Sequence, residues 1–458
     1  MRTTIRGHNQ KIWAIAWPMM LSSVSVPLLG LVDTALLGHL GSAQFLGAVA
    51  IGANIIGLMY WSFGFLRMGT TSLAARQHGA EMHLQGENGP SQAKDARSAD
   101  GILFRALVLA AILGSSVCLT VPLLVDAVLL WMHSSAKVTP LAYEYIDIRR
   151  LSAPAVFMTF AISGWLIGTQ RTRSALALVL TTNSVNIVLD IIFIKVLGLE
   201  SAGAAWATLI AEFMGLMLGL YLVGHHSQAA KPSLWRGWLR LSHFQSMLSV
   251  NYHLLIRTVL LLFVFNFFTA QGSTMGDETL AANAILLQLI LLTAFVLDGF
   301  SFAAEALCGE AYGGKQWITL ATIVKLCSYW SAGTALGFGI AYALFGDAII
   351  ALFSNVDSVI DIAQQYHWWM VGITVSGCAA YLMDGVCIGI GKTRAMHYSM
   401  WFATVIIFLP AWWLGRAWGN HGLWLAFAMF TLARGFTLAA YWQGLRIGGA
   451  PPLNNRVK

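Results

Sequence analysis

The sequence predicts an all-α membrane protein with about twelve transmembrane helices in two pseudo-symmetric six-helix bundles, at roughly 20 residues per span. Three observations support this fold class. The chain of 458 residues is 57% hydrophobic and only 10% charged, with a mean hydropathy of +0.69. A soluble domain carries about 25% charged residues, so this composition requires a bilayer as solvent. In addition, positive charge is concentrated in alternate loops, and the second half of the chain repeats the first.

The apolar runs define the predicted spans. A spanning helix needs roughly 20 mostly apolar residues, because the hydrocarbon core is about 30 Å thick. Several runs are longer than this and are expected to tilt or protrude. The predicted spans are residues 12–37, 46–75, 101–131, 141–168, 175–197, 202–223, 247–271, 279–304, 320–345, 361–390, 396–415 and 421–443.

The distribution of lysine and arginine predicts the orientation. With an even number of spans, both termini and every second loop lie on one side of the membrane. That side holds nineteen positive residues, whereas the other holds only Lys137, Lys195 and Arg416. Because lysine and arginine favour cytoplasmic loops, we expect a multi-pass protein with both termini in the cytoplasm. The net charge of +7 is thereby attributed to topology and not to a nucleic-acid partner.

Short segments recur in the same order in the two halves, about 220–234 residues apart. The matching segments are 46–51 with 280–285, 167–173 with 388–394, and 203–207 with 422–426. We therefore expect a six-helix bundle over residues 1–224, a cytoplasmic linker over 225–246 and a second bundle over 247–458. A parallel repeat of this kind places a substrate cavity between its halves.

Several function classes lack a sequence signature. We find no phosphate-binding glycine-rich loop, no metal-ligand spacing and no nucleophile motif, so we expect neither an enzyme nor a bound metal or cofactor. The five cysteines fall within or beside apolar stretches and are interpreted as core residues. Without an ATP-binding motif, we expect any transport to draw its energy from an ion gradient. Such a gradient supplies about 2.3 kcal/mol per charge for each 100 mV.

Ionisable residues inside predicted spans indicate function, because a charge at the bilayer centre costs about 2.5–3.5 kcal/mol on the insertion scale. Asp33 lies in the first span and Asp190 in the fifth. Asn186 lies four residues before Asp190 and shares its helix face, and Thr208 in the sixth span adds a hydroxyl. These four residues are predicted to form an oxygen-rich pocket in the first half, which can hold a proton or a sodium ion.

The second half has its own acidic residues. Asp298 and Asp384 are candidates for a central cavity that attracts a cation, and Tyr381 is a candidate aromatic lining residue. Glu305 lies near a predicted cytoplasmic end and is interpreted as an interfacial charge. The alternative for Asp298 and Asp384 is a polar contact between packed helices.

Two further groups of residues have a predicted role in the spans. Pro18 and Pro27 lie in the span that contains Asp33, and a proline removes a helical hydrogen bond and permits a kink. Such a kink is either static or responsive to protonation of Asp33. Arg149 and Arg150 lie near a span end and are interpreted as snorkelling interfacial residues.

The run from Pro27 to Leu40, with Val-Asp-Thr followed by Gly-His, resembles the first helix of the multidrug and toxic compound extrusion (MATE) family, in the form typical of its DinF subfamily. Residues 151–154, 186–190 and 297–300 fit the same pattern, and the resemblance covers essentially the whole chain. It implies two six-helix bundles and export of organic, often cationic, compounds or amphiphiles by alternating access, driven by protons or sodium ions.

The resemblance also implies site residues. The cation site of the DinF group lies in the N-terminal bundle, which corresponds to Asp33, Asn186, Asp190 and Thr208, with Tyr145 as a further candidate. Sodium-dependent members that resemble NorM use acids in the C-terminal bundle, and this chain has no acid in its seventh span, which favours protons. The expected setting is a monomer in the bilayer of a bacterial inner membrane.

Two alternatives remain open at the level of sequence. A lipid-linked precursor flippase shares the same superfamily layout and would require a strongly cationic cavity. An intramembrane enzyme or respiratory subunit would require histidine or metal ligands within the spans, and most histidines lie in loops or near span ends.

Overall fold

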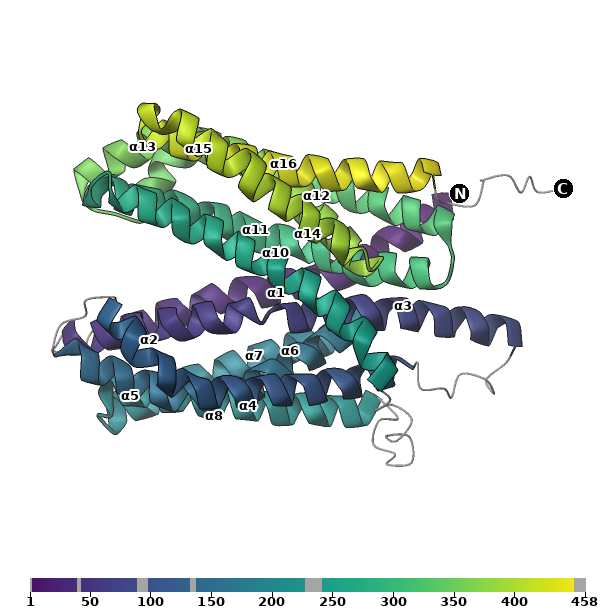
Figure 1. Ribbon diagram of the computed structural model, residues 1–458, viewed down its shortest axis with the longest axis horizontal. Coiled ribbons are helices and arrows are strands. Elements are labelled where there is room, and N and C mark those ends of the chain that lie inside the picture. Colours follow the sequence, from purple (N-terminus) through teal and green to yellow (C-terminus); the bar gives the residue numbers. More distant parts are fainter. Residues whose placement is uncertain (1, 39–42, 89–97, 132–136, 227–240, 449–458) are drawn as a thin grey trace. The chain divides into compact units, whose positions relative to one another are not determined.

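The computed structural model is all-helical over the residues that it describes, which are 2–38, 43–88, 98–131, 137–226 and 241–448. Eleven helical segments in this part of the chain are long and apolar enough to cross a membrane, and a bent pair of helices makes a twelfth. Helices are the expected outcome, because a bilayer offers no water to satisfy the backbone N–H and C=O groups. The predicted fold class is confirmed, and Figure 1 shows the order of the helices.

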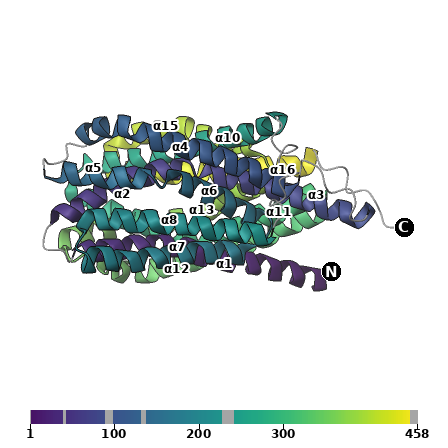
Figure 2. The ribbon, with the colours of Figure 1, turned by 90° about the horizontal axis from the view of Figure 1, so that it is seen from below.

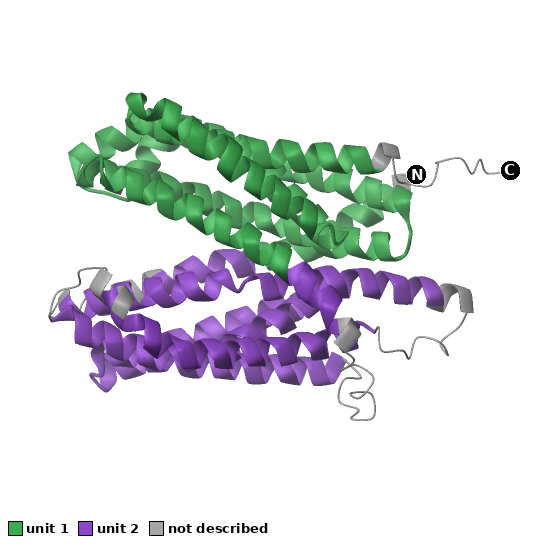
Figure 3. Ribbon diagram, viewed as in Figure 1, with its two compact units in different colours: residues 1–20, 252–458 green, residues 21–251 purple. Residues whose placement is uncertain are grey.

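The chain forms two compact units (Figure 3). Unit 1 comprises residues 1–20 and 252–458, and unit 2 comprises residues 21–251. Helix α1 (Arg2–Gly38) contributes its first half to unit 1, where a side chain at Gly299 would collide with Met20 and the carbonyl oxygen of Ala16. The first twenty residues thus pack with the second half of the chain, and the bundle boundaries expected from the sequence stay a prediction.

Within the described residues, unit 2 contains the remainder of α1, seven further α-helices and one π-helical segment, together with the first turns of α10. Helix α7 packs along α8, and Figure 2 shows them side by side. The elements are α2 (Ala43–Ser62), α3 (Phe65–Asn88), α4 (Ala99–Trp131), α5 (Val138–Arg150), α6 (Ala153–Gly168), α7 (Thr172–Asp190) and α8 (Glu200–His226), with the π-helical segment η1 (Ile191–Val196) between α7 and α8.

Two of the predicted spans in unit 2 are interrupted helices. Helices α5 and α6 together form one span that is bent by 49°. Pro154 is the second residue of α6. Because proline has no backbone N–H, it cannot donate a hydrogen bond to the preceding turn. Helices α2 and α3 are separated by a turn at Phe63 and Gly64.

Unit 1 is built around the long helices α11, α13 and α16. Glycine allows α11 and α13 to approach closely, because a side chain at Gly385 or Gly389 would collide with backbone oxygens of Ser301 and Glu305. The elements are α10 (Leu241–Ser273), α11 (Asp277–Gly313), α12 (Trp317–Ala351), α13 (Asp357–Gly389), α14 (Thr393–Trp401), η3 (Phe402–Phe408), α15 (Leu409–Gly415), η4 (Arg416–Trp418) and α16 (Asn420–Gly448).

The turns at the ends of α6 and α13 have the same backbone geometry. Gln170 and Gly391 both adopt a left-handed conformation, with φ of 62° and 74°. In each turn the following residue donates to a carbonyl five positions earlier, Arg171 to Leu166 at 2.7 Å and Lys392 to Cys387 at 2.8 Å. These turns belong to the two segments that recur in the sequence, so the repeat extends to local structure.

Candidate functional site

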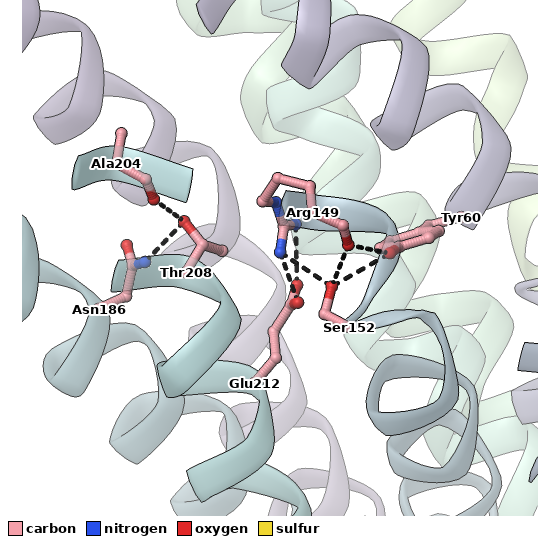
Figure 4. A network of polar contacts seen from close by, with 7 residues as sticks. All are labelled: Tyr60, Arg149, Ser152, Asn186, Ala204, Thr208 and Glu212. Atoms are coloured by element: carbon pink, nitrogen blue, oxygen red, sulfur yellow. Dashed lines mark hydrogen bonds and ion pairs between the residues drawn. The ribbon is translucent and has the colours of Figure 1, made fainter. Parts of the chain in front are cut away.

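Unit 2 brings together three of the residues predicted to bind a cation. Asn186 and Asp190 lie one helical turn apart near the end of α7, and both side chains are fully buried, with 1% and 0% exposed. The Asn186 amide lies 2.9 Å from the Thr208 hydroxyl on α8, and this hydroxyl lies 2.9 Å from the carbonyl oxygen of Ala204 (Figure 4). The predicted proximity of these residues is therefore found in the structure, while their role in binding a cation stays a prediction.

The Asn186 amide is placed between the Asp190 carboxyl group and Thr208. When its nitrogen faces Asp190, it donates to Oδ2 at 2.8 Å, and its oxygen accepts from the Thr208 hydroxyl at 2.9 Å. In the reverse orientation its nitrogen donates to Thr208 instead, and its oxygen faces Asp190. An ionised carboxylate only accepts hydrogen bonds, whereas a protonated one also donates. The first orientation therefore suits ionised Asp190, and the second suits protonated Asp190.

The backbone changes its geometry directly after Asp190. The segment η1 begins at Ile191 with a π-helical ladder, in which Leu197 donates to the carbonyl of Ile192 at 2.9 Å. Short π-helical segments inside helices are rare and occur frequently at functional sites. The wider turn places Asp190 at a junction between two helical geometries.

Tyr145 is buried in an apolar cluster beside this site. The cluster joins α5 to α8 and η1, and a side chain at Gly52 would collide with the Tyr145 ring. It contains Val49, Tyr145, Ile148, Ile194, Ala204, Ala205 and Leu209. Tyr145 therefore packs against the elements that carry the polar site, while its membership of a cation site stays a prediction.

Asp33, Pro18 and Pro27 lie on α1, which is helical from Arg2 to Gly38. The side chain of Asp33 lies outside the described part of the structure, so its place in the site stays a prediction. The kink expected at the two prolines likewise stays a prediction.

A second polar network lies next to the first, and sequence reasoning did not identify it. Arg149 at the end of α5 forms a two-pronged ion pair with Glu212 on α8, with distances of 2.5 Å and 3.0 Å (Figure 4). The Arg149 carbonyl oxygen accepts hydrogen bonds from the hydroxyls of Tyr60 and Ser152, both at 2.7 Å. Arg149 is buried, so its interpretation as a snorkelling interfacial residue is wrong.

The acidic residues of unit 1 have different partners. Asp384 on α13 is buried and forms ion pairs with Arg257 on α10 and with Arg434 on α16, the latter at 2.7 Å. Tyr381 and Asp298 are half-buried. The assignment of Asp298, Asp384 and Tyr381 to a substrate cavity stays a prediction.

Glu305 is buried on α11, and its interpretation as an interfacial charge stays a prediction. Among the described residues, no three His, Cys, Asp or Glu side chains gather in a way that could hold a metal ion.

Comparisons with known proteins agree with this architecture. The family model described as MatE matches residues 18–87, 91–192 and 254–413. DNA damage-inducible protein F of Escherichia coli (strain K12) is 36% identical over 451 residues, which cover 96% of this chain and 93% of that protein. The probable multidrug resistance protein NorM of Acinetobacter baylyi is 23% identical over 401 residues, which cover 83% of this chain and 84% of that protein.

Solved structures share the fold. A mutant of the Vibrio cholerae MATE transporter VcmN superposes with a TM-score of 0.86 at 21% sequence identity, and the match covers 98% of this chain and 99% of that chain. At this level of identity the likeness concerns the fold alone.

Proposed function

Because this chain belongs to the multidrug and toxic compound extrusion (MATE) family of transporters, we propose that it exchanges protons for organic, often cationic, compounds by alternating access. Its relatives include DinF and NorM proteins, and transporters of this family bind small organic substrates and use ion gradients. The proton as coupling ion and the cationic or amphiphilic character of the substrate are parts of the proposal.

The observation that carries the proposal is the burial of Asp190 against the Asn186 amide in unit 2. A buried charge is costly, so gain or loss of one proton changes the energy of this region substantially. The amide can meet either protonation state by presenting its nitrogen or its oxygen. A carboxyl group with such a partner can cycle between both states without losing its hydrogen bond.

Sodium remains the alternative coupling ion. A sodium ion needs several oxygen ligands at fixed distances, and the described part of the site offers those of Asp190, Asn186 and Thr208. One proton needs only the carboxyl group and one hydrogen-bond acceptor. The described geometry therefore supports a proton more directly.

The remaining parts of the proposal concern the setting of the site. We assign the coupling site to the N-terminal half, with Asp33 and Tyr145 as additional members, and substrate contacts to Asp298, Asp384 and Tyr381. The protein is expected in a bacterial inner membrane, as a monomer with both termini in the cytoplasm. A lipid-linked precursor flippase would need a cationic cavity, whereas Arg257 and Arg434 are both engaged by Asp384.

Efflux from proteoliposomes tests the proposal. The protein is reconstituted, a pH or sodium gradient is imposed, and export of a fluorescent organic cation is followed. Asp190→Asn is expected to reduce pH-driven export at least tenfold while the protein still folds. Asp147→Asn is the matched control, because this carboxylate is half-exposed and pairs with Arg150 at 2.6 Å on the same helix. Full pH-driven export by Asp190→Asn would contradict the proposal, and export driven by sodium alone would replace the proton with sodium.

A further inference from the structure

The ion pair between Arg149 and Glu212 ties α5 to α8 inside unit 2. Two guanidinium nitrogens meet the two carboxylate oxygens, and Arg149 Nη1 also donates to the Ser152 hydroxyl at 3.1 Å. The side chains are 9% and 17% exposed. A two-pronged pair of this kind fixes geometry as well as charge, because the planar guanidinium matches the carboxylate.

This ion pair lies where two interrupted helices meet. Helix α5 ends at Arg150, one residue after Arg149, and Tyr60 of α2 donates to the Arg149 carbonyl just before the turn between α2 and α3. Beside it, Phe63 of that turn stacks on Phe157 of α6 with ring centroids 4.5 Å apart. Interrupted helices in transporters commonly line binding sites, because their ends expose backbone groups and charge.

The same two helices carry the candidate coupling site. Tyr145 precedes Arg149 by four residues on α5, and Thr208 precedes Glu212 by four residues on α8. Each step corresponds to about 6 Å along the helix and keeps the side chains on one face. Figure 4 shows Arg149 and Glu212 next to Asn186 and Thr208.

We propose that the Arg149–Glu212 pair is a positioning and charge-setting element of the coupling site. It holds Tyr145 and Thr208 in register across the contact between α5 and α8, and it adds no net charge next to Asp190 because its own two charges cancel. The pH at which Asp190 binds its proton then depends on this pair. This inference rests on the proposed function, because it assumes that Asp190 carries the coupling proton.

Other titratable and charged groups lie on the elements packed around the pair and around Asp190. Tyr60 on α2 and Tyr145 on α5 are buried, and Asp33 on α1 is a member of the proposed coupling site. Arg150 pairs with Asp147 and bonds the Cys118 carbonyl of α4 at 2.9 Å. Helix α6 has no charged residue, and on α4 Arg105 precedes Cys118 by thirteen residues, or about 20 Å of helix. The exposed groups on the elements packed around the pair are Asp126 on α4, Glu144 on α5, Arg173 on α7, Lys195 on η1 and Glu200 on α8.

The two charges of the pair act on Asp190 in opposite directions. In general, at an effective dielectric constant of 20, a unit charge changes the proton affinity of a carboxyl group about tenfold, or by about one pH unit, if the two groups lie about 10 Å apart. Glu212→Gln leaves the positive charge of Arg149, so half-maximal transport is expected at a pH lower by about one unit. Arg149→Met leaves the negative charge of Glu212, so the midpoint is expected at higher pH. If the pair had a purely structural role, the two variants would not be expected to shift the midpoint in opposite directions.

The experiment measures pH-driven export of a fluorescent organic cation from proteoliposomes between about pH 5 and pH 9, a range chosen to cover the expected shift of about one unit on either side of neutrality. Glu212→Asp and Arg149→Lys are the matched controls, because they retain both charges and are expected to keep the midpoint of the wild type. Size-exclusion chromatography and thermal unfolding in detergent report the folded fraction of each variant. Shifts in the same direction for both neutralising variants, or no shift in folded protein, would overturn the proposal.

A double variant that exchanges the two charges provides a further test if a neutralising variant does not fold. Arg149→Glu combined with Glu212→Arg restores an ion pair but places the positive charge on α8, which packs on α7 and hence on the helix of Asp190. Because the exchanged pair still adds no net charge, the midpoint is expected to stay at that of the wild type, and a shift as large as that expected for a single neutralising variant would contradict charge setting. Loss of pH dependence in Asp190→Asn is measured in parallel. If export by Asp190→Asn still depends on pH, the proposed function fails. If its pH dependence is lost but the variants of the ion pair keep the wild-type midpoint, only this inference fails.

Discussion

Replacing Asp384 by asparagine is expected to destabilise unit 1. The Asp384 carboxylate on α13 accepts from Arg257 on α10 and from Arg434 on α16. Only 6%, 6% and 4% of these three residues are exposed, in that order. The substitution would leave two buried guanidinium groups without their shared carboxylate, and three helices would lose their common ionic contact.

The magnitude follows from the cost of breaking a buried ion pair. Removing one partner of such a pair costs about 3–5 kcal/mol, because the remaining charge stays buried. Asparagine keeps one oxygen that can accept from one guanidinium, so we expect about 3 kcal/mol for Asp384→Asn. Arg434→Gln is expected to cost less, about 1.5–3 kcal/mol, because Asp384 retains its bond from Arg257.

Thermal unfolding in detergent, followed by intrinsic tryptophan fluorescence, measures these effects. Asp347→Asn is a suitable control, because this carboxylate is exposed near the end of α12 and its loss is expected to change stability by less than about 0.5 kcal/mol. If Asp384→Asn unfolded at the wild-type temperature, the ion-pair argument would be refuted. Wild-type stability combined with loss of export would instead support the prediction that Asp384 contacts the transported cation.

Two further substitutions test close packing and the helix break. Gly385→Ala is expected to destabilise the protein by about 1–3 kcal/mol, because the added methyl group would meet the backbone of Ser301. Gly372→Ala is the control on the same helix. Its methyl group would enter open space, so the substitution is expected to be neutral or stabilising. Tyr60→Phe removes one of two hydroxyl donors to the buried Arg149 carbonyl and is expected to cost about 1–2 kcal/mol. Thermal unfolding measures both effects. Wild-type stability of Gly385→Ala would contradict the close packing of α11 and α13. Wild-type stability of Tyr60→Phe would contradict a stabilising hydrogen bond from its hydroxyl.

Most of the fold was predictable because the membrane imposes it. Apolar runs of sufficient length become helices wherever water is excluded, so the spans follow from the sequence. The break within residues 141–168 was not predicted, although Pro154 lies near its centre. Proline in a transmembrane run is compatible with a continuous helix or with a break. Here Tyr60 donates to the Arg149 carbonyl beside the break, a contact that a sequence pattern does not predict.

The site was predictable where its residues share a helix. Asn186 and Asp190 lie four residues apart in an apolar run, which is a local signal. Arg149 and Glu212 are separated by 63 positions, and each alone is compatible with an interfacial charge. The signal that could have found them is their similar depth: Arg149 lies eight residues and Glu212 ten residues after the start of its predicted span, and the two spans run in the same direction.

The buried carboxyl groups of the two units have different hydrogen-bond partners, and this difference is relevant to proton coupling. Asp384 faces guanidinium groups, which cannot give up their charge, so its negative charge is permanently required. Asp190 faces an amide, which can turn from donor to acceptor as the carboxyl group binds a proton. A transported proton must be bound and released in every cycle, so it is better served by the second arrangement than by the first. We therefore expect the charge of unit 2 to change during transport while that of the Arg257–Asp384–Arg434 cluster stays constant.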